Sequence, residues 1–386
     1  MKLHRTVDFY KKIKDLSIIG IAEISSTGIS ALFWFYVAFL FEPMKYGEIS
    51  FFISIATLSS TIALLGAANT MIVYTAKKVK IQTTIYTISL ISGTITSIVI
   101  FSIFYKIEVS LLVLGIIAFS LVTSEFLGRK LFQKFSIHTI LQRVLMIIFS
   151  FSLYFIFDES GIILGMALSY LPYFYTIFKS FKTVKFDLIL IKERFEFIKM
   201  NYLYTLTKAF SGSFDKILIG SIFGFSMLGN YALSWQFFIM MSILPRIVSK
   251  YILPRTSEGI EDKKLKNISI LSAFMIAILG TIFAPYTVPY FFPKFLDADI
   301  MMRIISWAVV PYTLFVIYET KFLALEQSKN LIYISITMTI TNLSSILILG
   351  NIFGSVGLAI SVVLSPSASV LCAYLLSRKS TSQFLK

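Results

Sequence analysis

Three charged side chains occur in an apolar stretch near the middle of the chain, where charge is costly. Lys208, Asp215 and Lys216 lie within "KAFSGSFDKILIGSIFGFSMLGNYALSW" (208–235). An ionised side chain at the centre of a bilayer costs from about 2.5 to more than 10 kcal/mol, so such residues face a bundle interior or an aqueous cavity. Lys208 and Asp215 are seven residues apart, which at about 100° per residue returns to within about 20° of one helix face. We expect them to line one cavity with Lys216 at its edge; the alternative is a neutralising pair that only fixes packing.

Two arginines occur in similar surroundings. Arg143 and Arg303 lie about one turn inside apolar stretches, in "RVLMIIF" and "MMRIISWAVV". A guanidinium binds phosphate oxygens through two parallel hydrogen bonds and is less strongly hydrated than an ammonium group. The alternative is that each long side chain extends to the membrane surface. With Lys208 and Lys216, these arginines are the candidate residues for binding an anionic substrate.

Glu23 is the first candidate for carrying a coupling ion. It lies in an apolar stretch beside Ser25, Ser26 and Thr27. Burial penalises the ionised carboxylate, so such a group can load and release a proton or another cation. Asp215 is the second candidate, and a structural hydrogen bond to a neighbouring helix remains the alternative for Glu23. One cysteine and two histidines exclude an internal disulfide and a histidine-rich metal site, so we predict neither a metal site nor catalytic residues.

The elements that must position these residues are membrane helices. The chain has 386 residues, 57% of them hydrophobic and 14% charged, with a mean hydropathy of +0.83; soluble domains are about 45–50% apolar and about 25% charged. A helix that crosses the hydrocarbon core needs ~20 mostly apolar residues. Twelve windows fit, and we predict an all-α polytopic membrane protein with spans at 16–41, 48–70, 82–105, 108–128, 137–157, 161–181, 199–224, 227–250, 267–292, 299–325, 330–350 and 354–376.

Charge in the loops predicts the orientation. With the N-terminus inside, 26 of the 35 Lys and Arg residues fall in inner segments, three in outer loops and six within spans. Cytoplasmic loops carry the excess of Lys and Arg, so we predict a plasma-membrane protein with both termini in the cytoplasm. The net charge of +15 is then mainly a topology signal and gives no indication of nucleic-acid binding.

The chain divides into two halves of six predicted spans. We expect an N-terminal six-helix bundle (1–181), a cytoplasmic linker (182–198) and a C-terminal six-helix bundle (199–386). Shifting one half over the other by 182 residues pairs "LFEPMKYGEISFF" (40–52) with "IFGFSMLGNYALSW" (222–235), so that Gly47 meets Gly229. Six spans per half would give both halves the same orientation, as in parallel transporter repeats.

Two stretches carry a family resemblance. The segment "SALFWFYVAFLFEPMKYGEISFFISIATLSSTIALLGAANTMIVYTAKK" (30–78) and the run "FDKILIGSIFGFSMLGNYAL" (214–233) resemble prokaryotic O-antigen or polysaccharide flippases of the multidrug, oligosaccharidyl-lipid and polysaccharide exporter superfamily. The resemblance implies two six-helix bundles facing each other in a V, no cofactor, and movement of a lipid-pyrophosphate-linked oligosaccharide from the inner to the outer leaflet. It also implies membrane lipids and polysaccharide-assembly proteins as partners, and leaves open whether H⁺ or Na⁺ is coupled.

Two other functions remain as alternatives. A cation-coupled multidrug exporter would share the fold, but six cations against four acids within the spans favour an anionic passenger. A membrane enzyme of envelope polysaccharide assembly would need a catalytic cluster and a large outer loop, and the sequence offers neither. The chain also lacks a GxxxxGK[ST] phosphate loop, so we expect no ATP hydrolysis and no enzymatic activity.

Overall fold

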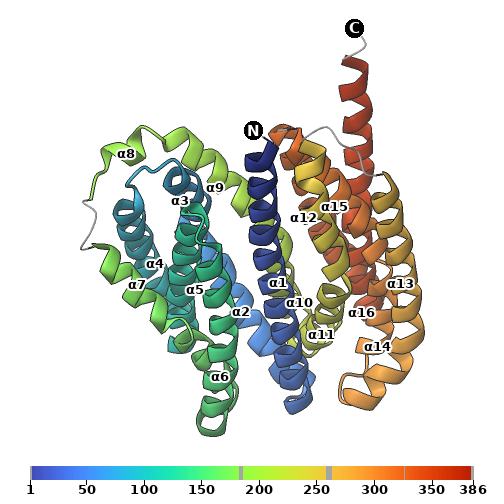
Figure 1. Ribbon diagram of the computed structural model, residues 1–386. Helices are drawn as coiled ribbons and strands as arrows, with labels where there is room; N and C mark the ends of the chain where they lie inside the picture. The colour runs from blue at the N-terminus through green and yellow to red at the C-terminus, as the bar shows by residue number, and fades with distance from the viewer. Residues whose placement is uncertain (1, 182–185, 258–262, 326, 384–386) are drawn as a thin grey trace. The chain divides into compact units, whose positions relative to one another are not determined.

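The computed structural model describes residues 2–181, 186–257, 263–325 and 327–383, and these are almost entirely helical (Figure 1). No β-strand occurs among them. The helices are α1 (Lys2–Leu40), α2 (Pro43–Leu64), α3 (Ala67–Ala76), α4 (Gln82–Phe104), α5 (Ile107–Gly128), α6 (Phe132–Leu168), α7 (Leu171–Phe181), α8 (Ile189–Lys192), α9 (Phe195–Ala209), the π-helical segment η1 (Phe210–Phe214), α10 (Asp215–Phe223), α11 (Phe225–Met241), α12 (Ile243–Ser257), α13 (Lys263–Phe291), α14 (Ala298–Ser306), α15 (Val309–Ala324) and α16 (Ser328–Gln383).

Many of these helices are long and apolar enough to cross a membrane. In the described part of the chain there are seven such helices, or up to nine if two bent pairs each count as one span. The pairs are α11 with the start of α12 and α14 with α15, bent by 41° and 44°. Two of the seven, Phe132–Ser180 and Lys329–Arg378, have 49 and 50 residues. A straight helix of that length would measure about 75 Å, against a hydrocarbon core of about 30 Å.

Both of these long segments fold back on themselves as helical hairpins. The backbone turns at Asp158 (φ 52°, ψ −131°) and at Gly354 (φ 55°, ψ −129°). In α6 the arms pack closely, and the Ser150 hydroxyl donates to the Ile162 carbonyl at 3.0 Å; in α16, Gly357 lies directly against the preceding arm. Each hairpin therefore supplies two crossings, and the helices of the described residues are consistent with the twelve predicted spans.

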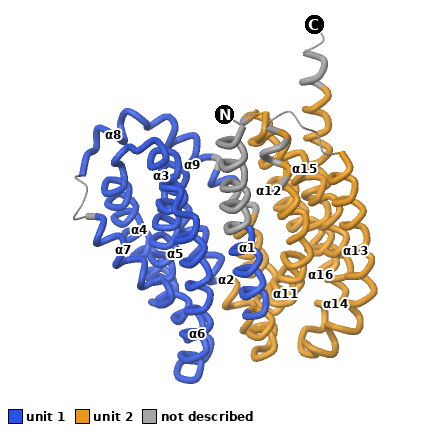
Figure 2. Tube along the Cα trace, in the orientation of Figure 1, with its two compact units in different colours: residues 1–33, 52–209 blue, residues 34–51, 210–386 orange. Residues whose placement is uncertain are grey.

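The chain forms two compact units (Figure 2). One comprises Met1–Phe33 and Phe52–Ala209, and the other comprises Trp34–Phe51 and Phe210–Lys386; we call them unit 1 and unit 2. This division differs from the predicted one, in which the boundary is the linker 182–198. The boundary differs because α9 packs within unit 1, and the end of α1 and the start of α2 pack within unit 2.

The core of unit 1 is built around α5, which packs against α3, α4, α6 and α7. Its buried side chains include Leu112, Ile117 and Leu121, all fully buried. Helix α9 is held to α3 at a tight turn, where Gly66 adopts φ 75° and lies against the backbone of Tyr202. Only glycine adopts that backbone conformation freely and leaves room for such a close approach.

Unit 2 contains a close contact between the starts of α2 and α11. Gly47 lies against the Phe225 carbonyl group, and Gly229 lies against the Pro43 carbonyl group. The two contacts are reciprocal, because adding 182 to positions 43 and 47 gives 225 and 229. The same shift aligned Gly47 with Gly229 in the sequence, so two copies of one motif meet here. The contact supports an internal duplication and explains why Trp34–Phe51 belongs to unit 2.

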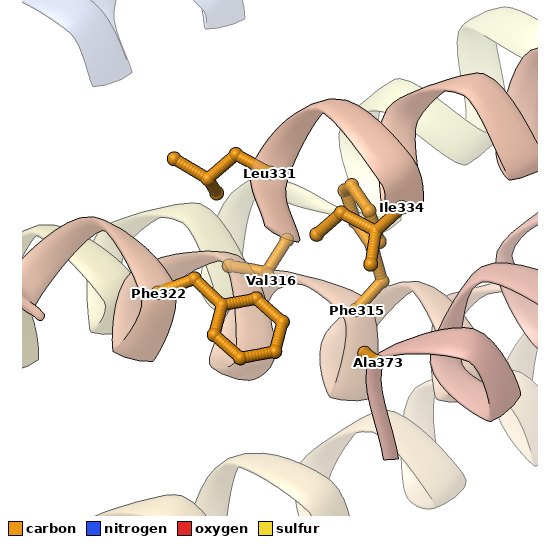
Figure 3. Close-up of a cluster of buried hydrophobic side chains, with 6 residues drawn as sticks. All are labelled: Phe315, Val316, Phe322, Leu331, Ile334 and Ala373. Atoms are coloured by element: carbon orange, nitrogen blue, oxygen red, sulfur yellow. The ribbon is translucent and has the colours of Figure 1, made fainter. Parts of the chain in front are cut away.

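Helices α15 and α16 form a second apolar core in unit 2 (Figure 3). The side chains of α15 pack on both arms of α16, and Ser369 on the second arm donates to the Ile334 carbonyl at 2.8 Å. The buried members of the cluster are Phe315, Val316, Phe322, Leu331, Ile334 and Ala373. Apolar packing between these helices fixes the arms of α16 within unit 2.

Candidate functional site

The charged stretch that begins the second half is a broken helix. Between α9 and α10, residues Phe210–Phe214 ("FSGSF") form one turn of π-helix. Gly212 and its serine neighbours favour such a distortion, because glycine weakens an α-helix and serine side chains compete for backbone hydrogen bonds. A π turn inserts extra backbone into a helix and is frequent at functional sites. Asp215 is the first residue after it.

Asp215 is a fully buried carboxylate held by three groups. Its side chain has 0% exposure. The Tyr231 hydroxyl of α11 donates to Oδ2 at 2.9 Å, and the Lys216 backbone N–H donates to Oδ1 at 2.8 Å. The Lys216 ammonium lies 3.6 Å from Oδ1. A buried charge requires such partners, because desolvation otherwise costs several kcal/mol.

Lys216 is held more loosely than Asp215. Its side chain is 13% exposed, and Nζ donates to the Gly212 carbonyl at 3.1 Å. Nζ also lies 5.0 Å from the centre of the Trp235 ring, which stacks on Tyr231 with ring centres 6.1 Å apart. An ammonium group has three donors. The π segment, through its Gly212 carbonyl, thus positions a cation beside a buried carboxylate and an aromatic ring.

The predicted pairing of Lys208 with Asp215 on one face does not follow from helix geometry. Lys208 lies near the end of α9, before the π segment, and its side chain lies outside the described part of the structure. The extra backbone of the π turn breaks the 100° spacing between these two positions. Lys216, expected only at the edge of the cavity, is the lysine seen beside Asp215.

Asn342 is a residue of this region that the sequence analysis missed. Its side chain is 5% exposed, and Oδ1 is buried with no hydrogen-bond partner among the described residues. Phe223 at the end of α10 lies against Gly350 on the first arm of α16, and α10 and this arm both run away from the end of unit 2 where the C-terminus lies (Figure 1). Asn342 and Asp215 each precede this contact by eight residues, a rise of about 12 Å, so they lie at similar depth. An asparagine within an apolar span was the available sequence signal.

Arg303 lies on α14 and has an acidic partner. Its guanidinium donates to Asp299 Oδ2 at 2.8 Å, one turn earlier, and its side chain is 42% exposed. Asp299 falls on the first residue of a predicted span and was not among the four acids counted against the six cations. The charge of Arg303 is therefore balanced locally by Asp299.

Substitutions of Arg303 and Asp299 separate substrate binding by Arg303 from its ion pair with Asp299. Arg303→Gln alone should lower the free energy of unfolding by no more than about 1 kcal/mol, because exposed ion pairs contribute little. If the guanidinium also binds the substrate, transport should fall severalfold in Arg303→Gln and remain near the wild-type rate in Asp299→Asn. Transport is measured in both single variants and in the double variant. Equal, small losses in all three would show that Arg303 only forms the exposed ion pair with Asp299 and does not bind the substrate.

Arg143 lies in unit 1 on the first arm of α6. Its Nη1 lies 3.8 Å from Met146 Sδ, and its Nε is buried without a hydrogen-bond partner among the described residues. The neighbouring Gln142 is fully buried and donates to Ser169 Oγ at 3.0 Å. A guanidinium with an unused N–H donor is suited to bind an anion, and the substrate-binding role of Arg143 stays a prediction.

Glu23 lies on α1 in unit 1 and is half-buried. The hydroxyl of Ser26 donates to the Glu23 backbone carbonyl at 3.1 Å.

No group of three or more His, Cys, Asp or Glu side chains that could hold a metal ion occurs in the described residues. The chemistry of the Asp215 site is that of a buried carboxylate beside the Lys216 ammonium on a broken helix, which suits binding and release of ions.

Solved structures share this fold. The flippase described as "Lipid II flippase MurJ, inward closed conformation" aligns with a TM-score of 0.68 and 13% identity, over 93% of this chain and 87% of that one. An inward-facing multidrug resistance MATE family transporter of the MOP superfamily gives 0.67 and 15%, over 94% and 98%. A MOP superfamily transporter from Pyrococcus furiosus gives 0.65 and 15%, over 97% and 96%. At these identities the likeness shows the fold alone, that of MOP superfamily transporters, and it confirms the predicted all-α membrane fold.

One sequence family matches directly. The family described as "Polysaccharide biosynthesis protein" matches residues 36–293, about two thirds of the chain. The matched region includes Arg143 and the Asp215 site and ends before Arg303. No curated protein sequence matches this chain.

Proposed function

This chain belongs to the family of polysaccharide biosynthesis proteins, and we propose that it is a flippase for a lipid-pyrophosphate-linked oligosaccharide. It would move this substrate from the inner to the outer leaflet of the plasma membrane, for assembly of a surface polysaccharide such as O-antigen. One combination carries the proposal: a polysaccharide-biosynthesis family sequence in a multi-pass membrane protein with a transporter fold. Making a surface polysaccharide requires a membrane-crossing step, and a transporter fold supplies it.

The substrate pyrophosphate would meet a set of cations during the crossing. We assign this role to Arg143, Lys208, Lys216 and Arg303. Lys216 is suited to transient binding, because its ammonium is 3.6 Å from Asp215 and uses one hydrogen bond to a backbone carbonyl. Asp215 would neutralise the lysine when no substrate is bound. Polysaccharide-assembly proteins outside would then consume the delivered substrate.

Two carboxylates would couple the cycle to an ion gradient. Asp215 is buried beside a break in its helix, and Glu23 lies half-buried on α1. Uptake of H⁺ or Na⁺ would offset the desolvation of either carboxylate. With no phosphate loop in the sequence, an ion gradient or consumption of the product is the available energy source.

The proposed orientation makes a topology prediction. Reporter fusions after Lys80 and Lys264 should report the cytoplasm, and fusions near Lys45 and Asp297 should report the outside, because Lys and Arg accumulate in loops that stay inside. Activity of a reporter that folds only in the cytoplasm, measured beside one that folds only outside, checks each position. Reversed signals at both Lys45 and Lys80 would contradict the proposed orientation and reverse the transport direction inferred from it.

The alternatives make different demands. A multidrug exporter for cationic compounds should present a net acidic cavity, whereas two acids of unit 2, Asp215 and Asp299, are each paired with a cation. A polysaccharide polymerase or acyltransferase would be an enzyme, whereas the matched solved structures are transporters. These observations favour the flippase.

A cellular experiment tests the proposal. In cells of the source organism that lack this protein, lipid-linked oligosaccharide should accumulate in the inner leaflet, where a glycan-cleaving enzyme added to intact cells cannot reach it. Restoring the wild-type chain should make the glycan accessible again. Unchanged accessibility after deletion, in cells without another protein of this fold, would overturn the proposal.

A further inference from the structure

Unit 1 contains an apolar cavity outside the proposed transport residues. Its volume is about 230 Å³, and its walls come from the end of α2, the starts of α3 and α4, and from α8 and α9. The wall is mainly aliphatic and aromatic, with Leu64, Ile85, Ile88, Ile191 and Phe195 among its residues. A dry cavity of about 150 Å³ lined by such side chains binds benzene. This cavity is large enough for a segment of hydrocarbon chain.

The polar groups of the wall leave the interior apolar. The Thr70 hydroxyl donates to the Gly66 carbonyl at 2.9 Å within its own helix turn, so its donor is already used. Lys199 is the charged residue of the wall, and it is exposed. A lysine places its stem along apolar surface and keeps its ammonium in water. The cavity therefore combines an apolar interior with a cation at its edge.

More positive charge gathers beside this cavity. The Lys77 ammonium and the Arg194 guanidinium lie 5.6 and 5.0 Å from the centre of the Tyr74 ring, which brings the end of α3 next to the start of α9. Arg194 is paired with Glu193 at 2.8 Å, so Lys77 carries the added charge of this pair of cations. Lys78 and Lys80 follow in the connection to α4. Clusters of basic residues at a membrane surface attract anionic lipid head groups.

The segment that covers the cavity has the composition of a membrane-surface segment. From residue 186 to the start of α9 several large apolar side chains are exposed, including Leu188 at 56%, Ile189 at 66% and Phe195 at 63%. They alternate with charged residues of both signs, and Glu193 accepts a hydrogen bond from Arg194 at 2.8 Å. An amphipathic segment of this kind lies in the interface between head groups and acyl chains, which brings lipid to the mouth of the cavity.

We propose that this cavity binds one acyl chain of an anionic phospholipid, with its phosphate at the Lys199 ammonium and the neighbouring basic residues. The lipid comes from the leaflet at the basic end of unit 1. It would join the covering segment to α3 and α4 and so stabilise unit 1. The site is separate from the proposed substrate cations and does not depend on the transport function.

Native mass spectrometry of the full-length protein tests the site, with dioleoyl phosphatidylglycerol and dioleoyl phosphatidylcholine as probes. The wild type should retain phosphatidylglycerol in preference to phosphatidylcholine. Ser89→Phe and Ile191→Trp each place a ring in the cavity from a different element and should remove the bound lipid. Ile95→Phe is the matched control, because Ile95 lies on the same helix as Ser89 but is 59% exposed, and it should behave as the wild type.

The charge is tested separately. Lys199→Gln should lower phosphatidylglycerol retention about fivefold, since a basic residue near an anionic surface contributes ~1 kcal/mol, while Lys294→Gln in unit 2 should leave it unchanged. Equal retention of both lipids by the wild type would overturn the proposal, whether or not the filled variants fold. Full retention of phosphatidylglycerol by a folded Ser89→Phe or Ile191→Trp variant would also overturn the proposal. An isoprenoid-linked lipid found in the cavity would assign it to a substrate tail instead.

Discussion

Replacing Gly47 by alanine should destabilise the protein by about 1–3 kcal/mol, the usual cost of overpacking. A methyl group there would overlap the Phe225 carbonyl group, which belongs to a helix start and cannot rotate away as a side chain would. Gly229→Ala should have a similar effect, because Gly229 makes the reciprocal contact with Pro43. Thermal unfolding in detergent, followed by size-exclusion chromatography, measures both.

Gly28→Ala is the matched control for these variants. A methyl group at Gly28 would have no atom within 4 Å, so this change should be neutral, or stabilising by up to about 1 kcal/mol because alanine favours helix. The double variant Gly47→Ala with Gly229→Ala should lose less than the sum of the two single losses, since both contacts belong to one interface. Stability of Gly47→Ala equal to that of Gly28→Ala would contradict the close packing described for α2 and α11.

Asp215→Asn should reduce gradient-dependent transport, measured per amount of folded protein, by at least tenfold. Asparagine keeps the size of the side chain and one oxygen that accepts a hydrogen bond from Tyr231, but it cannot hold a cation by charge. Tyr231→Phe is the control, because it removes a hydrogen bond to Asp215 and keeps the carboxylate. Transport in vesicles with and without a proton or sodium gradient should show gradient dependence in Tyr231→Phe and none in Asp215→Asn.

A double variant distinguishes coupling from packing. Asp215→Asn leaves the Lys216 ammonium without its carboxylate at 13% exposure, and an uncompensated charge of this kind lowers the protein level. Adding Lys216→Met should restore the protein level without restoring transport. If the double variant regains both, Asp215 and Lys216 are a packing pair, and the proposed role of either in transport is wrong.

Hydropathy and charge predict much of this fold because the bilayer imposes them on the sequence. Every span must be apolar over ~20 residues, so the helices lie close to their predicted windows, including both arms of the hairpins that turn at Asp158 and Gly354. The glycines that meet between α2 and α11 were aligned by the repeat alone. These features depend on local composition or internal similarity, both of which a single sequence displays.

The details of the site depend on contacts that composition does not encode. Asp215 was identified because a carboxylate is rare in a span, but its partner Tyr231 lies on another helix, and no local pattern connects the two. The π turn at Phe210–Phe214 shifts the faces of its helix, so the regular 100° spacing used to predict the pairing of Lys208 with Asp215 does not hold across it. Asn342 was missed because uncharged polar residues are common in membrane helices, so a single asparagine is a weak sequence signal for a functional site.

Transfer of substrate between leaflets is the most direct test of the central claim. Purified protein is reconstituted into vesicles that carry a labelled lipid-pyrophosphate-linked oligosaccharide, and a membrane-impermeant glycan-cleaving enzyme measures how fast the inner pool becomes accessible. Cationic drugs are tested in parallel, with and without a gradient. We expect the protein to accelerate exposure of the oligosaccharide, Asp215→Asn to slow it, and no drug to move. Drug transport without any movement of the oligosaccharide would contradict the account and identify a multidrug exporter.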